Sequence, residues 1–417
     1  MGTTRSFNDM LNEHLTLDLM REEWAKRDYF YSKVEKEDGW VGGNLPVPFE
    51  GAMASSVEFG ALTAENDISE YDYVRGNVSA QQEVWGTMVF NQRDLWEHGG
   101  PKEKTFLKIL PQQLNHFMDQ LKMKVSINLL SGPHLDVVTV DGTALGVLGV
   151  ARPDRFTIGQ KLTLIDGNTA QANYYVIAID MNDSTITLSA TRGGAAADVS
   201  AFTVAQSAKV YEVGVLVAGT PTNKFQSVGD ALLSLANGGG ASLHGVTKTA
   251  YPFLQAQNIS GAAISATNLL EKLFDAFNQV RVRARGSNAR EFLMSYKHLG
   301  TAMKQIETQK GGFKVSADSR KASEYGWDEI EITSVKGSLK LVGIQEMPDD
   351  KIFIIDWDSF KFCSNGGFKD NVDPDGNRYH KVRGTTGYKY IVDMALFGEL
   401  VVKAPHKSAV IHSIPNY

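Results

Sequence analysis

The most constraining feature of the sequence is one long apolar stripe in residues 102–130. Its members recur every three or four residues, the period of one helix face: Phe106, Leu110, Leu114, Phe117, Leu121, Val125 and Leu129. Pro101 suits the first helical turn, Pro111 predicts a kink, and Gly132-Pro133 ends the pattern. At 1.5 Å per residue such a helix spans roughly 43 Å. Because that exceeds the width of a small domain, we expect other parts of an assembly to help cover it.

Two segments ahead of this helix also have no core of their own in which to bury their apolar side chains. Residues 1–44 predict an N-terminal arm with an amphipathic helix at 7–31. Residues 45–98 predict an extended hairpin with an acidic tip, and a two-stranded ribbon is only marginally stable alone. We therefore expect the arm and the tip to contact other subunits, through Trp24, Glu65, Asp67 and Glu70.

The composition changes abruptly after the long helix. Residues 134–214 have almost no helical pattern and contain short strand-like runs separated by turn signals: 161–165, 174–179, 185–189 and 209–213. Strands of this length and spacing are typical of a small β-barrel or sandwich. Because helices resume on both sides, we expect a β module inserted into a host domain.

The remainder of the chain mixes helices and strands, so the predicted fold class is α+β. A second long helix is expected at 265–284, a strand at 291–295 and a short helix at 297–309. Further strands are expected at 329–332, 339–342, 352–355, 388–392, 399–402 and 409–412.

Composition excludes several classes of protein. The chain has 417 residues, 42% of them hydrophobic, and this argues against wholesale disorder. Its formal charge of −6 argues against a protein whose main task is to neutralise phosphates. A single cysteine, Cys363, excludes a disulfide framework and a cysteine-based zinc site. No apolar run is long enough for a membrane helix, so we expect no membrane contact.

Signatures of catalysis are largely missing from the sequence. It contains no GxxxxGK[ST] phosphate loop, no GxGxxG after a strand, no HExxH and no GxSxG, so we expect neither an enzyme nor a cofactor. Asn371, Asp373 and Asp375, followed by Gly376, match the first half of a calcium loop. The final glutamate of such a loop is replaced by Val382, and an ordinary tight turn explains the same residues.

A basic cluster follows the second long helix and has two interpretations. Arg281, Arg283, Arg285 and Arg290 could form a nucleic-acid patch. Alternatively, they stabilise the negative end of the helix dipole, and they are candidates for contacts between subunits. The second interpretation agrees better with the acidic net charge.

The order of these parts resembles that of the major capsid proteins of tailed bacteriophages, with the HK-ninety-seven-like fold. The C-terminal half resembles the family in detail, at residues 268–274, 291–295, 343–356, 399–405 and 409–411. For residues 343–356, the resemblance implies paired strands joined by the Met347-Pro348-Asp349 turn. It also implies an arm (1–44), an extended loop hairpin (45–98) and a spine helix (99–133). After the spine helix, the resemblance implies four further parts: an inserted β domain (134–214), a peripheral domain (215–286), an axial domain (287–365) and returning C-terminal strands (366–417).

The resemblance implies pentamers and hexamers of one chain in an icosahedral virion shell, assembled in a host cytoplasm. Implied partners are a portal, a separate scaffolding protein and a decoration protein, with double-stranded DNA enclosed without sequence-specific binding. A Lys, Asn and Glu set for covalent crosslinking, known in a few members, cannot be matched here. Two alternatives remain: the shell of an encapsulin-like cellular nanocompartment, and an enzyme or binding protein that uses the β module.

Overall fold

The computed structural model describes most of the chain from residue 29 onward. The described ranges are 29–40, 43–49, 74–78, 82–91, 117, 119–121, 123–132, 134–166, 171–206, 208–217, 220–221, 224–283, 287–308, 329–334, 337–370, 380–384 and 387–415. They fall into two compact units. The first contains Gln82–Phe225 and Phe368–Phe397, and the second contains the described parts of Tyr29–Gln81, Gln226–Gly367 and Gly398–Tyr417.

In the first unit a closed six-stranded barrel is built from residues 134–212. Its strands, in chain order, are β5 (His134–Val140), β6 (Val147–Val150), β7 (Lys161–Ile165), β8 (Gln171–Asp180), β9 (Thr185–Ser189) and β10 (Lys209–Glu212). They close in the order β10-β5-β6-β9-β8-β7, and every pairing is antiparallel. The sequence predicts four of these strands but misses β5 and β6, because polar residues (Asp136, Thr139) interrupt the apolar run of β5 and Gly149 interrupts that of β6.

The barrel shares its core with the preceding helix. Residues 119–121 and 123–131 are helical, which agrees with the C-terminal half of the predicted helix at 102–130. Ile127 of this helix belongs to the same buried cluster as Leu148, Leu164 and Val176 of the barrel, and Met123 packs against that cluster.

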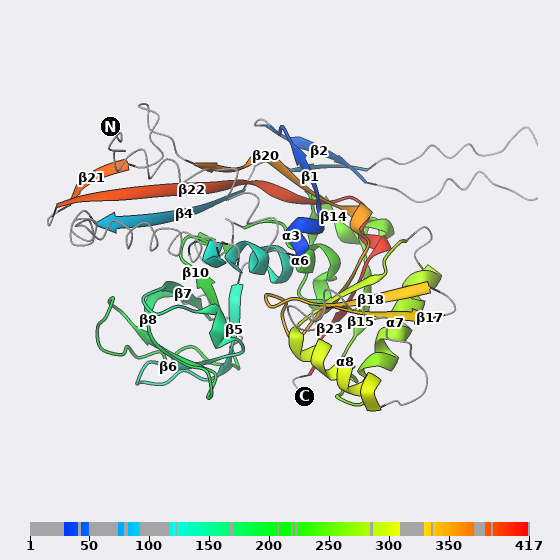
Figure 1. Cartoon of the computed structure of the whole chain (residues 1–417), viewed down its shortest axis with the longest axis horizontal. Coiled ribbons are helices and arrows are strands. Elements are labelled where there is room, and N and C mark those ends of the chain that lie inside the picture. Colours follow the sequence, from blue (N-terminus) through cyan, green and yellow to red (C-terminus); the bar gives the residue numbers. More distant parts are fainter. Residues whose placement is uncertain are drawn as a thin grey trace, which may run out of the picture. The chain divides into compact units, whose positions relative to one another are not determined.

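The long sheet contains the longest strand of the fold (Figure 1). Its order is β1 (Glu35–Asp38), β20 (Phe360–Asp370), β22 (Gly387–Val402) and β21 (His380–Gly384), and β4 (Gln82–Asn91) also pairs with β22. The sequence predicts two strands where β22 runs unbroken. Gly398 does not break β22. Instead, it leaves room for the ring of Phe362, which lies only 2.6 Å from where a Cβ at Gly398 would be.

The second extended run expected for the hairpin, residues 71–90, contributes its described residues to two different sheets. β3 (Arg75–Val78) pairs antiparallel with β2 (Leu45–Pro48), and we call β2 and β3 the ribbon. β4 pairs with β22 instead of extending the ribbon. The expectation that the run over 71–90 pairs only within the hairpin is therefore wrong for β4. The long-range partner β22 could not be inferred from local alternation.

The second unit contains a six-stranded mixed sheet. Its order is β15 (Gln257–Ser260), β23 (Ala409–His412), β19 (Ile352–Ile355), β16 (Glu291–Met294), β18 (Gly337–Gly343) and β17 (Glu329–Ser334). The expectation that the strands on either side of the Met347-Pro348-Asp349 turn pair with each other is wrong, since β16 lies between β18 and β19. The connection from Ile344 to Lys351 is longer than a tight hairpin turn, and it can pass one strand.

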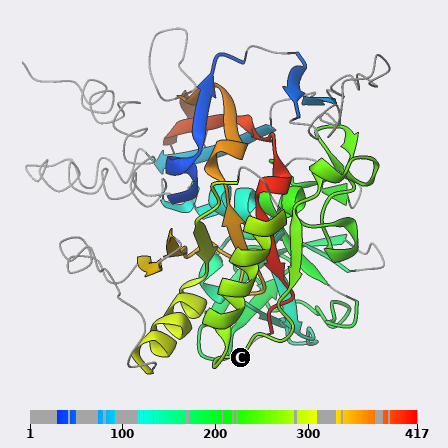
Figure 2. The ribbon, with the colours of Figure 1, turned by 90° about the vertical axis from the view of Figure 1, so that its right-hand side faces the viewer.

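Two helices pack against this sheet: α7 (Leu269–Arg283) and α8 (Tyr296–Thr308), as Figure 2 shows. The second long helix expected at 265–284 is present as α7, and the apolar residues Leu270, Leu273 and Val280 on one of its faces are buried. Gln305 of α8 accepts a hydrogen bond from the Leu270 N–H at 2.9 Å, so α8 satisfies an amide in the first turn of α7.

Shorter elements complete the described chain. The remaining helices and strands are α3 (Tyr29–Lys33), α6 (Val228–Leu232), β11 (Leu216–Val217), β12 (Thr220–Pro221), β13 (Ser242–Leu243) and β14 (Val246–Thr247). Short 3₁₀ turns lie at Pro153–Arg155, Leu235–Asn237, Lys248–Ala250, Pro252–Leu254, Trp357–Ser359 and Pro405–Lys407.

Candidate assembly surfaces

The end of the N-terminal arm packs on its own chain. Phe30 of α3 is fully buried and lies 5.7 Å from the ring of Trp357, and Tyr31 makes an edge contact with Phe362. β1 then pairs in parallel with β20, and Lys361 lies 2.7 Å from Glu35. For residues 29–40, the expectation that the arm contacts other subunits rather than its own core is wrong. The aromatic side chains of Tyr29, Phe30 and Tyr31 give this part of the arm an apolar surface, which the sequence-based expectation did not take into account.

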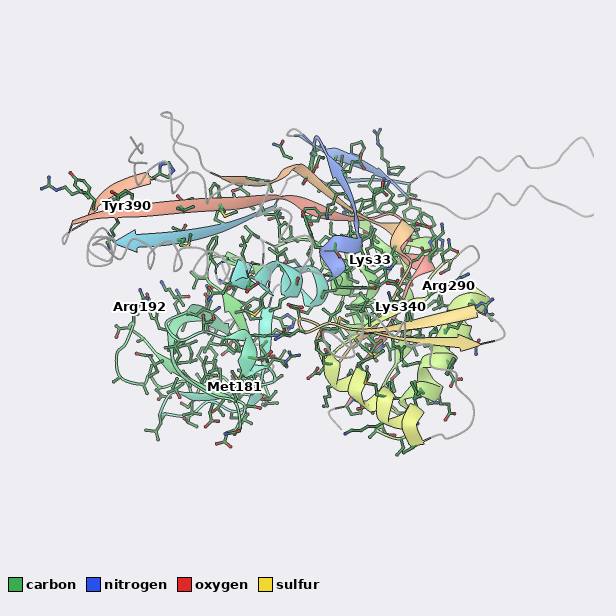
Figure 3. All side chains as sticks on the ribbon, in the orientation of Figure 1. Lys33, Met181, Arg192, Arg290, Lys340 and Tyr390 are labelled. Carbon is green, nitrogen blue, oxygen red and sulfur yellow. The ribbon has the colours of Figure 1, made fainter. Side chains whose placement is uncertain are left out.

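Tyr29 fixes the orientation of this segment. Its hydroxyl donates to Glu291 Oε2 at 3.0 Å, and the Trp357 Nε1–H donates to the same oxygen at 2.7 Å. Lys33 and Lys340 place their ammonium groups 5.7 and 5.8 Å from the centre of the Tyr29 ring, and Figure 3 shows both lysines in this region. Cation–π attraction thus adds to the hydrogen bonds.

Among the described residues of the first unit, β4 carries the most exposed aromatic side chain, Trp85. Along residues 83–89 the odd-numbered side chains are exposed, and the even-numbered positions are half-buried. On the covered side, the Phe117 ring lies 2.5 Å from where a Cβ at Gly86 would be. Only glycine at position 86 therefore leaves room for the ring of Phe117, which belongs to the helix before the barrel. On the open side, Trp85 is 54% exposed and Val89 is 50% exposed.

Trp85 is held in place although it is exposed. Its ring meets Phe397 of β22 edge-on at 5.7 Å, and its Nε1–H donates to Glu83 Oε2 at 2.9 Å. An ordered indole with an apolar face open to solvent is typical of a protein–protein contact. The sequence signal for this surface is the alternation in residues 82–89, which predicts a strand but does not show that its open side stays uncovered.

The structure describes only two of the predicted contact residues. Arg281 and Arg283 are exposed at the end of α7. The Arg281 guanidinium lies 5.5 Å from the centre of the Phe277 ring, and Arg283 donates to Gln257 at 3.1 Å. Their position at the C-terminal end of α7 fits stabilisation of the helix dipole. The other predicted residues lie outside the described residues: Trp24, Glu65, Asp67, Glu70, Arg285, Asn371, Asp373 and Asp375.

Two buried charged side chains, Lys248 and Asp136, bind backbone groups. Lys248 donates to the backbone carbonyls of Asp230 and, at 3.0 Å, Leu233, where α6 ends, and burial lowers its pKa to about 8. In the barrel, Asp136 accepts from the backbone amides of Val137 and Arg152, and burial raises its pKa. These side chains hold main-chain groups in place.

The described ranges lack the residue clusters and the long apolar helices that metal sites and membrane spans need. They contain no cluster of three or more His, Cys, Asp or Glu side chains that could hold a metal ion. No helix among the described residues is long and apolar enough to cross a membrane.

Comparison with known proteins gives matches only at the level of structure. No protein-family model matches the sequence. No curated protein is significantly similar to it.

The structural matches extend over most of the chain. It is similar to the capsid asymmetric unit of cyanophage A-1(L), with 12% identity and a TM-score of 0.46, over 92% of this chain and 91% of that one. It is also similar to the capsids of a native and an empty GTA particle, with 10% and 11% identity and a TM-score of 0.43 for each. Those two alignments cover 92% of this chain and 89% of the other. All three are capsid structures.

Proposed function

We propose that this chain is the major capsid protein of a tailed bacteriophage, which self-assembles into an icosahedral shell around a double-stranded DNA genome. In this proposal the shell consists of pentamers and hexamers with a portal. A separate scaffolding protein directs its assembly, and a decoration protein can bind outside. The role is structural, so the chain needs no cofactor and has no catalytic site. The mature location is the virion, after synthesis in the host cytoplasm.

The observation that carries the proposal is the exposed face of β4. A subunit that associates with its neighbours needs apolar side chains that its own fold leaves uncovered. Trp85 and Val89 meet this need on a strand of ten residues. Their companions Glu83 and Thr87 are polar, which is typical of a surface that must also stay soluble before assembly.

The order of the parts supports the same proposal. Ribbon, helix, barrel and six-stranded sheet follow one another in the order that the resemblance implies. Arg281 and Arg283 are also exposed at a helix end, where they can meet acidic groups of another subunit.

Substitutions on β4 and in the acidic segment test the proposal. We expect Trp85→Ala and the triple charge reversal of Glu65, Asp67 and Glu70 to Lys to reduce assembled material in sedimentation velocity, with folding unchanged by circular dichroism. Like charges brought together at a contact cost several kcal/mol. Val137→Ala, on the exposed side of the barrel strand β5, is the matched control. If both variants sediment like the parent chain, β4 and the acidic segment are not assembly surfaces.

A further inference from the structure

The base of the ribbon rests on a single histidine. His244 and Gly245 join β13 to β14, and both have positive φ, 48° and 81°, as in a type I′ hairpin turn. Glycine adopts this backbone freely, but histidine adopts it only rarely. The turn places the His244 ring in the interior, where the residue is only 8% exposed.

Three elements of the second unit meet at His244. Phe49, which directly follows β2, stacks on it with a centroid distance of 6.1 Å and an interplanar angle of 18°. The Asn77 N–H of β3 donates to the His244 carbonyl at 2.8 Å. At the end of β22, the Val402 N–H donates to His244 Nε2 at 3.0 Å.

The packing leaves little freedom at this joint. Gly76 of β3 is so close to the Phe49 ring and to the His244 carbonyl that an added Cβ would lie 2.6 and 3.0 Å from them. The ribbon is therefore seated on His244 through a ring contact from one strand and a backbone contact from the other.

The bond from Val402 requires a neutral imidazole. Nε2 can accept a hydrogen bond from the Val402 N–H only if it carries no proton itself, and in the imidazolium both ring nitrogens are donors. Protonation would therefore place the Nε2–H against the Val402 N–H and would put a charge beside the Phe49 ring in a buried site.

From this joint we infer that His244 is a proton-sensitive latch, which in its neutral form seats the ribbon on the end of β22 and releases it when the imidazole is protonated. The device belongs to the single subunit and does not depend on the proposed shell. In an assembly it would make the position of the ribbon responsive to acid.

Burial dominates the protonation of the His244 ring. The charged residues nearest along the described strands that meet it are Arg75 of β3, Glu399 near the end of β22 and Lys403, which follows β22. Glu399 Oε1 accepts from the backbone amides of Gln226 and Leu400. Burial lowers the pKa of His244 to about 4.

The lowered pKa of His244 determines how ribbon opening depends on pH. When the ribbon opens, His244 regains an ordinary pKa near 6.5, so the open state takes up the proton first as the pH falls. The equilibrium constant for ribbon opening should therefore rise about tenfold for each pH unit between about 6.5 and 4, and stay constant above that range.

Hydrogen–deuterium exchange of the free full-length chain tests the latch, with rates corrected for the intrinsic effect of pH. Amides of residues 45–49 and 75–78 should lose protection with that slope, while amides of β19 remain protected. His244→Gln should abolish the slope, and His298→Gln, which removes another buried histidine, should keep it. Any of three results would overturn the proposal. These are an equal slope in His244→Gln, no slope in the parent chain, and simultaneous loss of amide protection in the ribbon and in β19.

A second measurement covers the case in which His244→Gln does not fold. Selective ¹³C labelling of histidine allows each imidazole to be titrated by NMR in the parent chain. The latch requires His244 to titrate near 4, together with the exchange slope described above. A His244 signal that titrates near 6.5 while the ribbon amides stay protected would overturn it.

Discussion

The ammonium group of Lys124 lies 2.8 Å from the carboxylate of Glu212 and joins the helix to the last strand of the barrel. Nearby, His134 and Tyr211 make an edge contact at 6.3 Å and are Cα partners in the neighbouring strands β5 and β10. The points where the chain enters and leaves the barrel are therefore about 5 Å apart, as expected for antiparallel partners. This geometry suits an inserted module, and the helix supports it from outside through Ile127.

The shared core predicts how the barrel responds to substitution in the helix. Ile127→Ala removes a side chain buried among barrel residues and should lower the free energy of unfolding of the first unit by roughly 2–5 kcal/mol. Urea unfolding checks this, with Val137→Ala as a control of similar size on the exposed side of the barrel. A shift no larger than that of the control would show that the helix and the barrel do not share a core.

The adjacent ends of the barrel predict the outcome of its removal. Replacement of residues 134–214 by a short Gly/Ser linker should leave a soluble, folded remainder, because the linker has only a short distance to span. Ile127→Gln and Met123→Gln should accompany the deletion, since both side chains lose their apolar partners. Circular dichroism and gel filtration give the result. Insoluble chain, even with these two changes, would place the barrel inside the core of its host.

Docking of the arm predicts a local effect of Phe30. Phe30→Ala removes a fully buried ring and costs roughly 3–5 kcal/mol. Opening of α3 and β1 should rise by at least about a hundredfold, since each 1.4 kcal/mol is a factor of ten. Tryptic cleavage after Lys33 and Lys36 reports this opening, and Ser32→Ala on the exposed side of α3 is the control. Unchanged cleavage in Phe30→Ala would mean that the arm is held elsewhere.

The acidic balance and the position of the arginines predict weak DNA binding. Shells and free subunits should bind duplex DNA weakly, and replacement of Arg281, Arg283 and Arg285 by Ala should change nothing. If these side chains neutralised phosphates, the logarithm of affinity would fall with the logarithm of salt concentration by about 0.9 per contact. Titration of labelled duplex DNA at low and at moderate salt distinguishes weak binding from neutralisation of phosphates by these arginines. Tight, salt-sensitive binding lost in the triple variant would contradict the prediction.

Elements with strong local periodicity could be predicted from the sequence. The apolar face of α7 and strands such as β7, β9 and β19 follow directly from spacing and β-branched content. Pairing over long distances could not be predicted in the same way. The partner of β4 lies about 300 residues away, and β16 separates two strands that are neighbours along the chain.

The surfaces were harder to predict than the elements. The docking of Tyr29 and Phe30 depends on Glu291 and Trp357, which no local pattern connects to the arm. The role of His244 depends on a positive φ at a non-glycine residue, and the sequence offers no marker for it beyond the following Gly245.

Electron microscopy of the purified chain in negative stain tests the central proposal most directly. The chain, expressed with its scaffolding partner where assembly requires one, should form closed particles of uniform diameter, and Trp85→Ala should reduce their number. A nanocompartment shell would also be closed, and it would be distinguished by an enclosed enzyme in place of scaffold. Only monomers or irregular aggregates, under conditions in which the chain is folded, would contradict a shell-forming function.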